Sequence, residues 1–446
     1  MTLFHHAVTI IWPGFHPGTS RLHAPDFTSS WESLWARGPA LFHATIWHAA
    51  VNLSIRRRSP ITEHASLMHY HRALRYLSEA VHASVDDVGE SIMFAILALA
   101  TAEEGPYQES QHAITGFVPP FPELQWLNIL SRRPMVAVHR EAMFRLVDLR
   151  GGLDALTMQG LAGAIFFLDV ISATSNLSPP HFSIPTAFRF GDGFEYQRSP
   201  IESSEETSSA IHQLRSLGLV KEVHEVMLEM RSWTNYLEMC SDGSVPSPDL
   251  ALISAQRSIL QHRLLCTLSP SKGHEAVSSD SREASEDGDT PEVTDLVQSG
   301  TLIFSTGVVF PIADTQVHHR LAKRLKRQLL RFQDGMLKPD LHDLSIWLCM
   351  LGCLAAIQAS DQTLRDWFLE AVLQVEKRRA TRRREAYRTG MVADNKRFAA
   401  KVPFMVRSWS VTRDSCLRNF LWHSHACDLV AEVVWKEVQW KAKHCI

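Results

Sequence analysis

Apolar residues recur at helical spacing along this chain, and that spacing constrains the fold more than any other feature. In residues 39–56, side chains such as Leu41, Trp47 and Val51 follow one another at intervals that place them on one face of an α-helix. Similar spacing recurs in most of the chain, whereas no run of useful length alternates apolar and polar residues as a half-buried strand does. The sequence therefore predicts an all-α fold.

The predicted helices follow one another closely, with Pro, Gly or polar residues between them. Pro39 stands in the first turn of its helix, where the missing N–H costs nothing. Short breaks between helices are typical of antiparallel hairpins, so we expect a multi-helical array of such hairpins. The predicted helices cover residues 39–56, 61–82, 88–103, 135–150, 153–175, 207–240, 249–266, 295–309, 317–334, 341–359, 361–388 and 414–440.

One segment, 269–295, interrupts this pattern. It is rich in Ser, Asp and Glu and has no aromatic residue. Such a composition cannot bury enough apolar surface to offset its ordering entropy, so we expect a disordered acidic linker. We expect this linker to join two packed helical halves, 39–268 and 296–446, and residues 1–38 to form an irregular N-terminal segment.

Composition excludes several protein classes. The net charge is −3, whereas a domain that binds nucleic acid is usually strongly basic. The seven Cys include no C-x-x-C pair, which argues against a disulfide scaffold and for a reducing compartment. The longest uncharged run, 344–360, is just shorter than the ~18 residues of a membrane span. We therefore expect a buried core helix there and no membrane association.

Motifs of common enzyme chemistry are missing from the sequence. It contains no G-x-x-x-x-G-K-[ST] phosphate loop and no G-x-S-x-G nucleophile elbow. Gly191-Asp192-Gly193 lacks the third Gly of a dinucleotide fingerprint and is interpreted as a turn. Cys349 and Cys353 lie one helical turn apart without further metal ligands nearby, which favours small buried side chains. We expect no catalytic residue, metal or cofactor.

Asp86, Asp87 and Glu90 carry the main alternative hypothesis. Aspartate-rich motifs on helices hold Mg²⁺ in all-α isoprenoid enzymes, because a magnesium–diphosphate cluster needs several oxygen ligands. Here the acids stand where a helix is expected to begin, so Ser84 or Asp86 can cap it and the carboxylates face its positive dipole end. The motif for a second metal site is absent. Capping is favoured, and a Mg-dependent isoprenoid-type enzyme remains the alternative.

Two segments concentrate basic residues. Residues 318–327 form a basic helical face with apolar partners at Leu321, Leu325, Leu329 and Leu330. Clusters of this kind serve as nuclear-import signals or nucleic-acid patches, and they also occur on solvated helix faces. The acidic segment 269–295 of the same chain could also attract them. The second and denser cluster is the candidate nuclear-import patch, made of Lys377, Arg378, Arg379, Arg382, Arg383 and Arg384.

A Gly pair marks a sharp corner between two predicted helices. Gly151 and Gly152 follow the last periodic residue of the helix 135–150, which is typical of a left-handed helix stop. We expect the corner to determine the local fold. It consists of Leu149, Arg150, Gly151, Gly152 and Leu153.

Several of these segments resemble the fungal-specific transcription factor domain, the regulatory region of many fungal zinc-cluster regulators. Its first conserved block is similar to ALFHATIWHAA, MHYHRALRYLSEAV and ESIMFAILALA within residues 39–103. HREAMFRLVDLRGGLDAL at 139–156 is the most specific match. FFLDVISATSNLSPPHF at 166–182 and LRNFLWHSHACDLVAEVVWKEV at 417–438 also fit.

The resemblance implies a nuclear transcription regulator without enzymatic activity. The zinc-cluster head of such regulators needs six closely spaced Cys, whereas the first Cys here is Cys240. We therefore expect action through protein partners or an effector rather than direct DNA binding, unless an upstream segment encodes the head. A non-enzymatic scaffold without a transcriptional role is a further alternative.

Overall fold

The computed structural model describes residues 3–11, 38–57, 64–83, 89–101, 115–132, 137–158, 160–189, 205–268, 293–332, 335, 338–388 and 406–444. These residues form helices, turns and connecting segments, and none of them lies in a β-strand. The predicted all-α class is confirmed. Contact clustering divides the chain into two units, which we describe separately.

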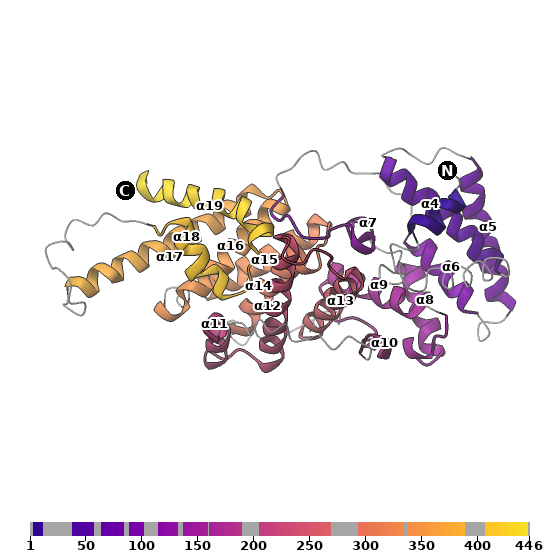
Figure 1. The fold of residues 1–446 in the computed structure, drawn as a ribbon, viewed down its shortest axis with the longest axis horizontal. Coiled ribbons are helices and arrows are strands. Elements are labelled where there is room, and N and C mark those ends of the chain that lie inside the picture. The colour runs from indigo at the N-terminus through magenta and orange to yellow at the C-terminus, as the bar shows by residue number, and fades with distance from the viewer. Residues whose placement is uncertain are drawn as a thin grey trace, which may run out of the picture. The chain divides into compact units, whose positions relative to one another are not determined.

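The first unit comprises residues 1–111, 121–197 and 248–266. Its α4 and α5 lie side by side, and α6 packs on α4 (Figure 1). The apolar stretch Met93 to Ala100 of α6 is buried on every side, which explains why that helix carries no polar face. Its helices are α1 (Leu3–His6), α4 (Pro39–Arg57), α5 (His64–Ala83), α6 (Glu90–Ala100), α7 (Leu127–Leu130), α8 (Ala137–Leu149), α9 (Leu161–Asn176), α10 (Thr186–Arg189) and α13 (Leu250–Cys266), with 3₁₀ turns at Leu124–Trp126 and Leu153–Ala155.

The start of the chain differs from the expected irregular segment. Residues 3–6 form α1 and Ala7–Ile11 continue it as a π-helix, while 12–37 lie outside the described residues. Ala7 and Ile11 are buried, and His6 Nε2 hydrogen-bonds with Asn52 Oδ1 of α4 at 3.0 Å. Burial against α4 stabilises a helix too short to persist alone, so sequence periodicity gives little signal for it.

The second unit comprises residues 112–120, 198–247 and 267–446. It therefore includes 198–247, which the sequence analysis assigns to the first half, and 112–120, which comes from early in the chain. Its helices are α11 (Glu205–Ser216), α12 (Lys221–Ser241), α14 (Val293–Phe304) with a π-helix (Ser305–Val309), α15 (Thr315–Arg331), α16 (His342–Gln358) after a 3₁₀ turn (Pro339–Leu341), α17 (Gln362–Arg388), α18 (Trp409–Ser415), a 3₁₀ turn (Leu417–Asn419) and α19 (Ser424–His444).

Helix α16 forms the centre of the second unit. It packs against α14, α15, α17 and α19, and every residue from Leu344 to Ala356 is buried. Residues Pro339–Gln358 are long and apolar enough to span a membrane, but 83% of that window is buried inside the structure. The run predicted as a buried core helix is therefore found in that role.

Glycine residues with positive φ explain where the helix boundaries differ from the predicted ones. The predicted helix 207–240 is two helices, because Gly218 takes a φ of +96° between α11 and α12. Similarly, α9 begins at Leu161 rather than at residue 153, after Gly160 with a φ of +83°. These conformations terminate a helix and cost an L-residue more than they cost glycine. The predicted helix 414–440 is also interrupted, and α19 begins at Ser424.

The acidic segment 269–295 lies outside the described residues except for its last three. Val293, Thr294 and Asp295 form the first turn of α14, where Asp295 is the acidic residue. Thr294 also accepts a hydrogen bond from the backbone N–H of Val220, at 3.2 Å. The disorder expected for the rest of the segment stays a prediction.

The segment 115–120, here called the strap, is non-helical, and its Gly116 and Phe117 are buried in the second unit. Gly116 N–H donates to Gln358 Oε1 at 2.9 Å, and Val118 N–H donates to Ala426 O at 2.9 Å. Between them, Phe117 is buried with its ring 5.9 Å from the ring of His318. His318 is thus a core residue, which corrects its assignment to a basic helical face. Leu330, expected to be an apolar partner on that helix, is 45% exposed.

Burial of His318 predicts a dependence of stability on pH. Burial lowers the pKa of His318 from 6.5 to about 4, although a hydrogen bond to Ile312 O opposes the shift. Between these values the unfolded chain binds the proton and the folded chain does not, so the free energy of unfolding falls as pH falls from 6.5 towards 4. The full effect is about 3 kcal/mol, because one pKa unit corresponds to roughly 1.4 kcal/mol.

Urea denaturation between pH 7 and pH 4 measures this effect, with His318→Gln as the comparison. Gln keeps a donor for Ile312 O and does not titrate, so we expect its stability to fall less steeply with pH. Parallel pH profiles of the two proteins would contradict the assignment. Burial also lowers the pKa of His43, His48, His69, His224, His342 and His423, so the variant is expected to remove only part of the slope.

Candidate functional site

The corner after α8 has the geometry of a left-handed helix stop. Gly151 and Gly152 have φ values of +92° and +97°. Gly152 N–H donates to Val147 O and Gly151 N–H donates to Asp148 O, each at 3.0 Å, which is the paired bonding of a Schellman motif. Leu153, in the 3₁₀ turn that follows, is buried, whereas Leu149 is 58% exposed. Leu153 rather than Leu149 therefore anchors the corner in the core.

Replacement of Gly151 by Val tests the importance of this corner. We expect the free energy of unfolding to fall by about 1–2 kcal/mol, because a β-branched residue is strained at positive φ. Only Ala155 Cβ lies near an added Cβ, at 3.8 Å, so backbone strain rather than steric overlap is the cause. Gly151→Asn should cost less, since Asn tolerates left-handed backbone. Equal melting temperatures for wild type and Gly151→Val would refute this role.

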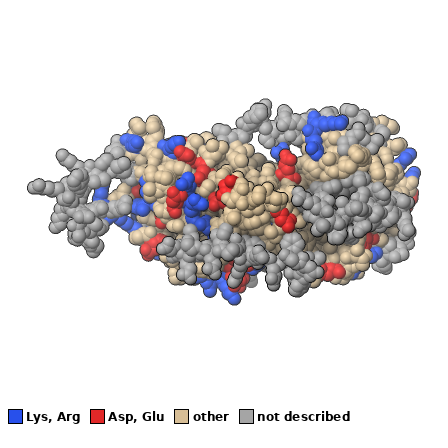
Figure 2. Space-filling model, viewed as in Figure 1, with Lys and Arg blue, Asp and Glu red and all other residues tan. Residues whose placement is uncertain are grey.

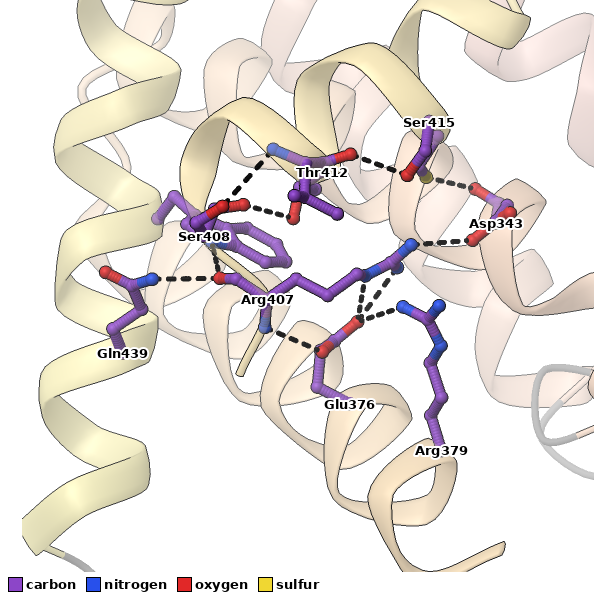
Figure 3. A network of polar contacts seen from close by, with 11 residues as sticks. Asp343, Glu376, Arg379, Arg407, Ser408, Thr412, Ser415 and Gln439 are labelled. Atoms are coloured by element: carbon purple, nitrogen blue, oxygen red, sulfur yellow. Dashed lines mark hydrogen bonds and ion pairs between the residues drawn. The ribbon is translucent and has the colours of Figure 1, made fainter. Parts of the chain in front are cut away.

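A buried polar network around Arg407 and Glu376 lies beside the start of the basic segment in α17 (Figure 3). Arg407 Nη2 and Nε donate to Glu376 Oε1 at 2.9 and 3.1 Å, and Arg407 Nη1 donates to Asp343 Oδ1 at 3.2 Å. The side chains of Arg407 and Glu376 are only 8% and 3% exposed. Arg379 adds a longer contact to Glu376 Oε1, at 3.6 Å. The carboxylate of Glu376 is thus shared by two guanidinium groups.

The backbone of Arg407 extends the network to α19. Its carbonyl oxygen accepts hydrogen bonds from Trp435 Nε1 at 2.9 Å and Gln439 Nε2 at 2.8 Å. The next residue, Ser408, caps α18 by accepting a hydrogen bond from the N–H of Val411. Arg407 therefore connects α16, α17 and α19, and the adjacent Ser408 begins α18. Sequence reasoning missed it because Arg407, Glu376 and Asp343 are distant in sequence and belong to no recognised motif.

The predicted basic patch occupies the last turns of α17. Arg378 and Arg384 are exposed, Lys377 and Arg382 are half-buried, and the side chain of Arg383 lies outside the described residues. Successive residues of a helix are about 100° apart, so these cations surround α17 rather than form one face. Arg379 is instead directed into the Glu376 network (Figure 3).

The positive charges of this patch also shift the pKa of His342, the first residue of α16. Burial lowers the pKa of His342, and the charges of Arg382 and Arg379 lower it further. On the face seen in Figure 2, blue and red side chains are interspersed over α17, α18 and α19. Ion pairs such as Arg365 with Glu437 and Arg413 with Asp414 also bring opposite charges together on these helices. The visible face over these helices shows no extended surface of one sign.

Of the acidic trio, Glu90 is in the described part of the chain, while Asp86 and Asp87 are outside it. Glu90 is the first residue of α6, and its N-cap is Gly89, which makes no side-chain cap, rather than Ser84 or Asp86 as expected. The Glu90 carboxylate accepts hydrogen bonds from the backbone N–H groups of Thr157 and Met158. These hydrogen bonds attach the segment before α9 to the first residue of α6.

Cys349 and Cys353 are fully buried in α16. Burial raises the pKa of Cys349 to about 12 and that of Cys353 well above its usual value, so both stay thiols at neutral pH. Across the described residues, no group of three or more His, Cys, Asp or Glu is placed to hold a metal ion. Both cysteines are thus the small buried side chains that the sequence favours at these positions.

Comparison with known proteins identifies the family. The sequence model of the fungal-specific transcription factor domain matches residues 4–428 of the 446. No curated protein and no solved structure matches the chain. The matched range includes the Gly151 corner, the α16–α17 core and Arg407. The family is one of regulatory domains of transcription factors, which supports a role in transcription regulation and suggests a protein without enzymatic activity. On this match, which extends over most of its length, the chain belongs to the fungal-specific transcription factor domain family.

Proposed function

We propose that this chain regulates transcription in the nucleus through protein partners or an effector, rather than through DNA contacts of its own. The observation that carries the proposal is the family match over residues 4–428, together with a sequence whose seven Cys, the first of them Cys240, lack the spacing of a zinc cluster. The mixed charges over α17, α18 and α19 and the net charge of −3 also speak against a DNA-binding surface of the usual basic kind.

A tethering experiment tests the regulatory role. The full chain is fused to a heterologous DNA-binding domain and expressed in a fungal host that carries a reporter with the matching operator. We expect reporter transcription to differ from that with the DNA-binding domain alone. The purified chain alone should bind duplex DNA only weakly at physiological salt. An unchanged reporter, with unchanged transcripts after deletion of the gene, would contradict the proposal.

The basic patch supports nuclear import as the way the chain reaches its place of action. The triple variant Arg378→Ala, Arg382→Ala, Arg384→Ala is expected to lower the nuclear fraction of a fluorescent fusion several-fold. Arg379 is left in place because it contacts Glu376. The matched control removes equal charge from the exposed residues Arg57, Arg72 and Arg145, which lie outside both basic segments. Equal localisation of the two variants would show that the patch of α17 is not an import signal.

A further inference from the structure

Two histidine side chains face each other where α5 packs on α4. His43 Nδ1 of α4 lies 2.8 Å from His69 Nδ1 of α5, which is a hydrogen-bond distance. The ring of His43 is also stacked on that of Tyr76, two turns further along α5, with 5.7 Å between the ring centroids. Phe42 packs edge-on against the same ring, and only 8% of His43 is exposed. These contacts fix the His43 ring with its Nδ1 directed at His69.

The two facing nitrogens have room for a single proton. In a neutral pair, one Nδ1 carries the hydrogen and donates it to the lone pair of the other Nδ1. A first added proton binds at Nε2 of the donating ring and leaves this bond intact. A second added proton must bind at the accepting Nδ1, so two N–H groups then point at each other and the bond is lost. The closed pair therefore takes up at most one proton, whereas two separated imidazoles take up two.

The charges around the pair oppose its protonation. Arg72 and Arg75 of α5 act on it, and both are cations. The described residues of α4, and residues 3–11 that pack on it, include no Asp or Glu. The acidic residues of α5 and α6 are Glu79, which pairs with Arg75 at 3.6 Å, and Glu90, which binds the segment before α9. Burial lowers the pKa of both facing histidines, and the charge of Arg72 lowers it further.

The other histidines of these elements do not share the contact. His6 hydrogen-bonds with Asn52, and His48 Nδ1 lies 3.2 Å from Ala98 O of α6. The proton balance of the contact between α4 and α5 therefore depends on the facing pair. The exposed histidines of α1 and α5 are His5, His64, His71 and His82.

We propose that the contact between α4 and α5 is pH-sensitive: it stays closed while His43 and His69 share one proton, and it opens when each ring carries its own. The sign follows from the proton count. The open form binds more protons, so opening is favoured as the pH falls below about 6.5, the ordinary pKa of a histidine. Each additional proton bound on opening multiplies the opening constant about tenfold per pH unit. The inference does not depend on the proposed function, since it concerns only this contact.

Opening here is local, because α5 is held mainly by one neighbour. It packs on α4 and, over fewer residues, on α6, and many of its residues are exposed. A helix with few buried contacts opens at a lower free-energy cost than the whole domain. Separation of α5 from α4 uncovers Trp47, which is 3% exposed in the closed form and packs on Tyr70. A fall in pH therefore exposes apolar surface on α4.

Hydrogen exchange of the full chain, followed by mass spectrometry, tests the proposal. Protection factors of peptides from α5 are compared at pH 7 and pH 5, after correction for the pH dependence of intrinsic exchange. We expect the protection of α5 in the wild type to fall at least about tenfold, because the open form binds at least one proton more. Protection of α5 that is the same at both pH values would overturn the proposal, whatever the variants show.

His69→Gln separates this contact from other sources of pH dependence. The Gln amide donates to a neutral His43 Nδ1 and accepts from a protonated one, so the bond survives protonation. We expect the fall in α5 protection to be about tenfold smaller than in the wild type, and His43→Gln to behave similarly. The matched control is His71→Gln on the exposed side of α5, which should keep the wild-type fall. An equal fall in all four proteins would refute the shared proton as its cause.

Discussion

Replacing Arg407 with Met is expected to lower the free energy of unfolding by about 3–5 kcal/mol, the usual cost of removing one partner from a buried ion pair. Glu376 is 3% exposed, and it would keep the long hydrogen bond from the backbone N–H of residue 407, at 3.5 Å, and the longer contact to Arg379 but lose the guanidinium of residue 407. The loss also leaves Asp343 without its hydrogen bond from Arg407. Urea denaturation followed by circular dichroism measures the change.

The double variant Arg407→Met, Glu376→Met provides the control for this prediction. Replacing both charges with apolar residues of similar size removes the uncompensated carboxylate, so the double variant should be more stable than Arg407→Met alone. Both variants keep the backbone carbonyl that binds Trp435 and Gln439, so the position of residue 407 is retained. A double variant that is less stable than the single variant would mean that packing, rather than charge, explains the loss.

Replacement of Gly116 by Ala should destabilise the second unit by about 3 kcal/mol, the upper end of the usual range for overpacking. An added Cβ would lie 2.0 Å from Leu354 O, which belongs to the backbone of the central helix α16 and cannot rotate away. Relief of this overlap requires the strap to move, which disrupts the hydrogen bonds of Gly116 to Gln358 and of Val118 to Ala426. The buried Phe117 would move with it.

Gly89→Ala is the matched control for the strap. An added Cβ there meets only Ser91 Oγ, at 3.7 Å, and the φ of −63° suits any L-residue. We expect a loss of only about 0.5–1 kcal/mol, because Ala is a poorer N-cap residue than Gly. If thermal unfolding shows the same midpoint for Gly116→Ala as for Gly89→Ala, the strap is not held as tightly as the distances indicate.

Local sequence signals predicted the parts of the candidate site that depend on neighbouring residues. The pair Gly151-Gly152 indicates a helix stop because few other residues adopt its backbone angles. The uncharged run 344–360 indicates a buried helix because it is apolar all round and just shorter than the ~18 residues of a membrane span. The basic run in α17 was also visible, but the sequence did not show that Arg379 contacts Glu376.

The sequence by itself determined the helical class and the positions of most helices, because helix formation follows from side-chain spacing, glycine and proline within a few residues. Only the tertiary structure decided that residues 112–120 and 198–247 belong with the C-terminal unit, and that Arg407 connects α16, α17 and α19. It also decided that His318 is buried and that α5 meets α4 through a pair of histidines. Such features depend on which surfaces remain for packing after the helices form, and that choice involves residues far apart along the chain.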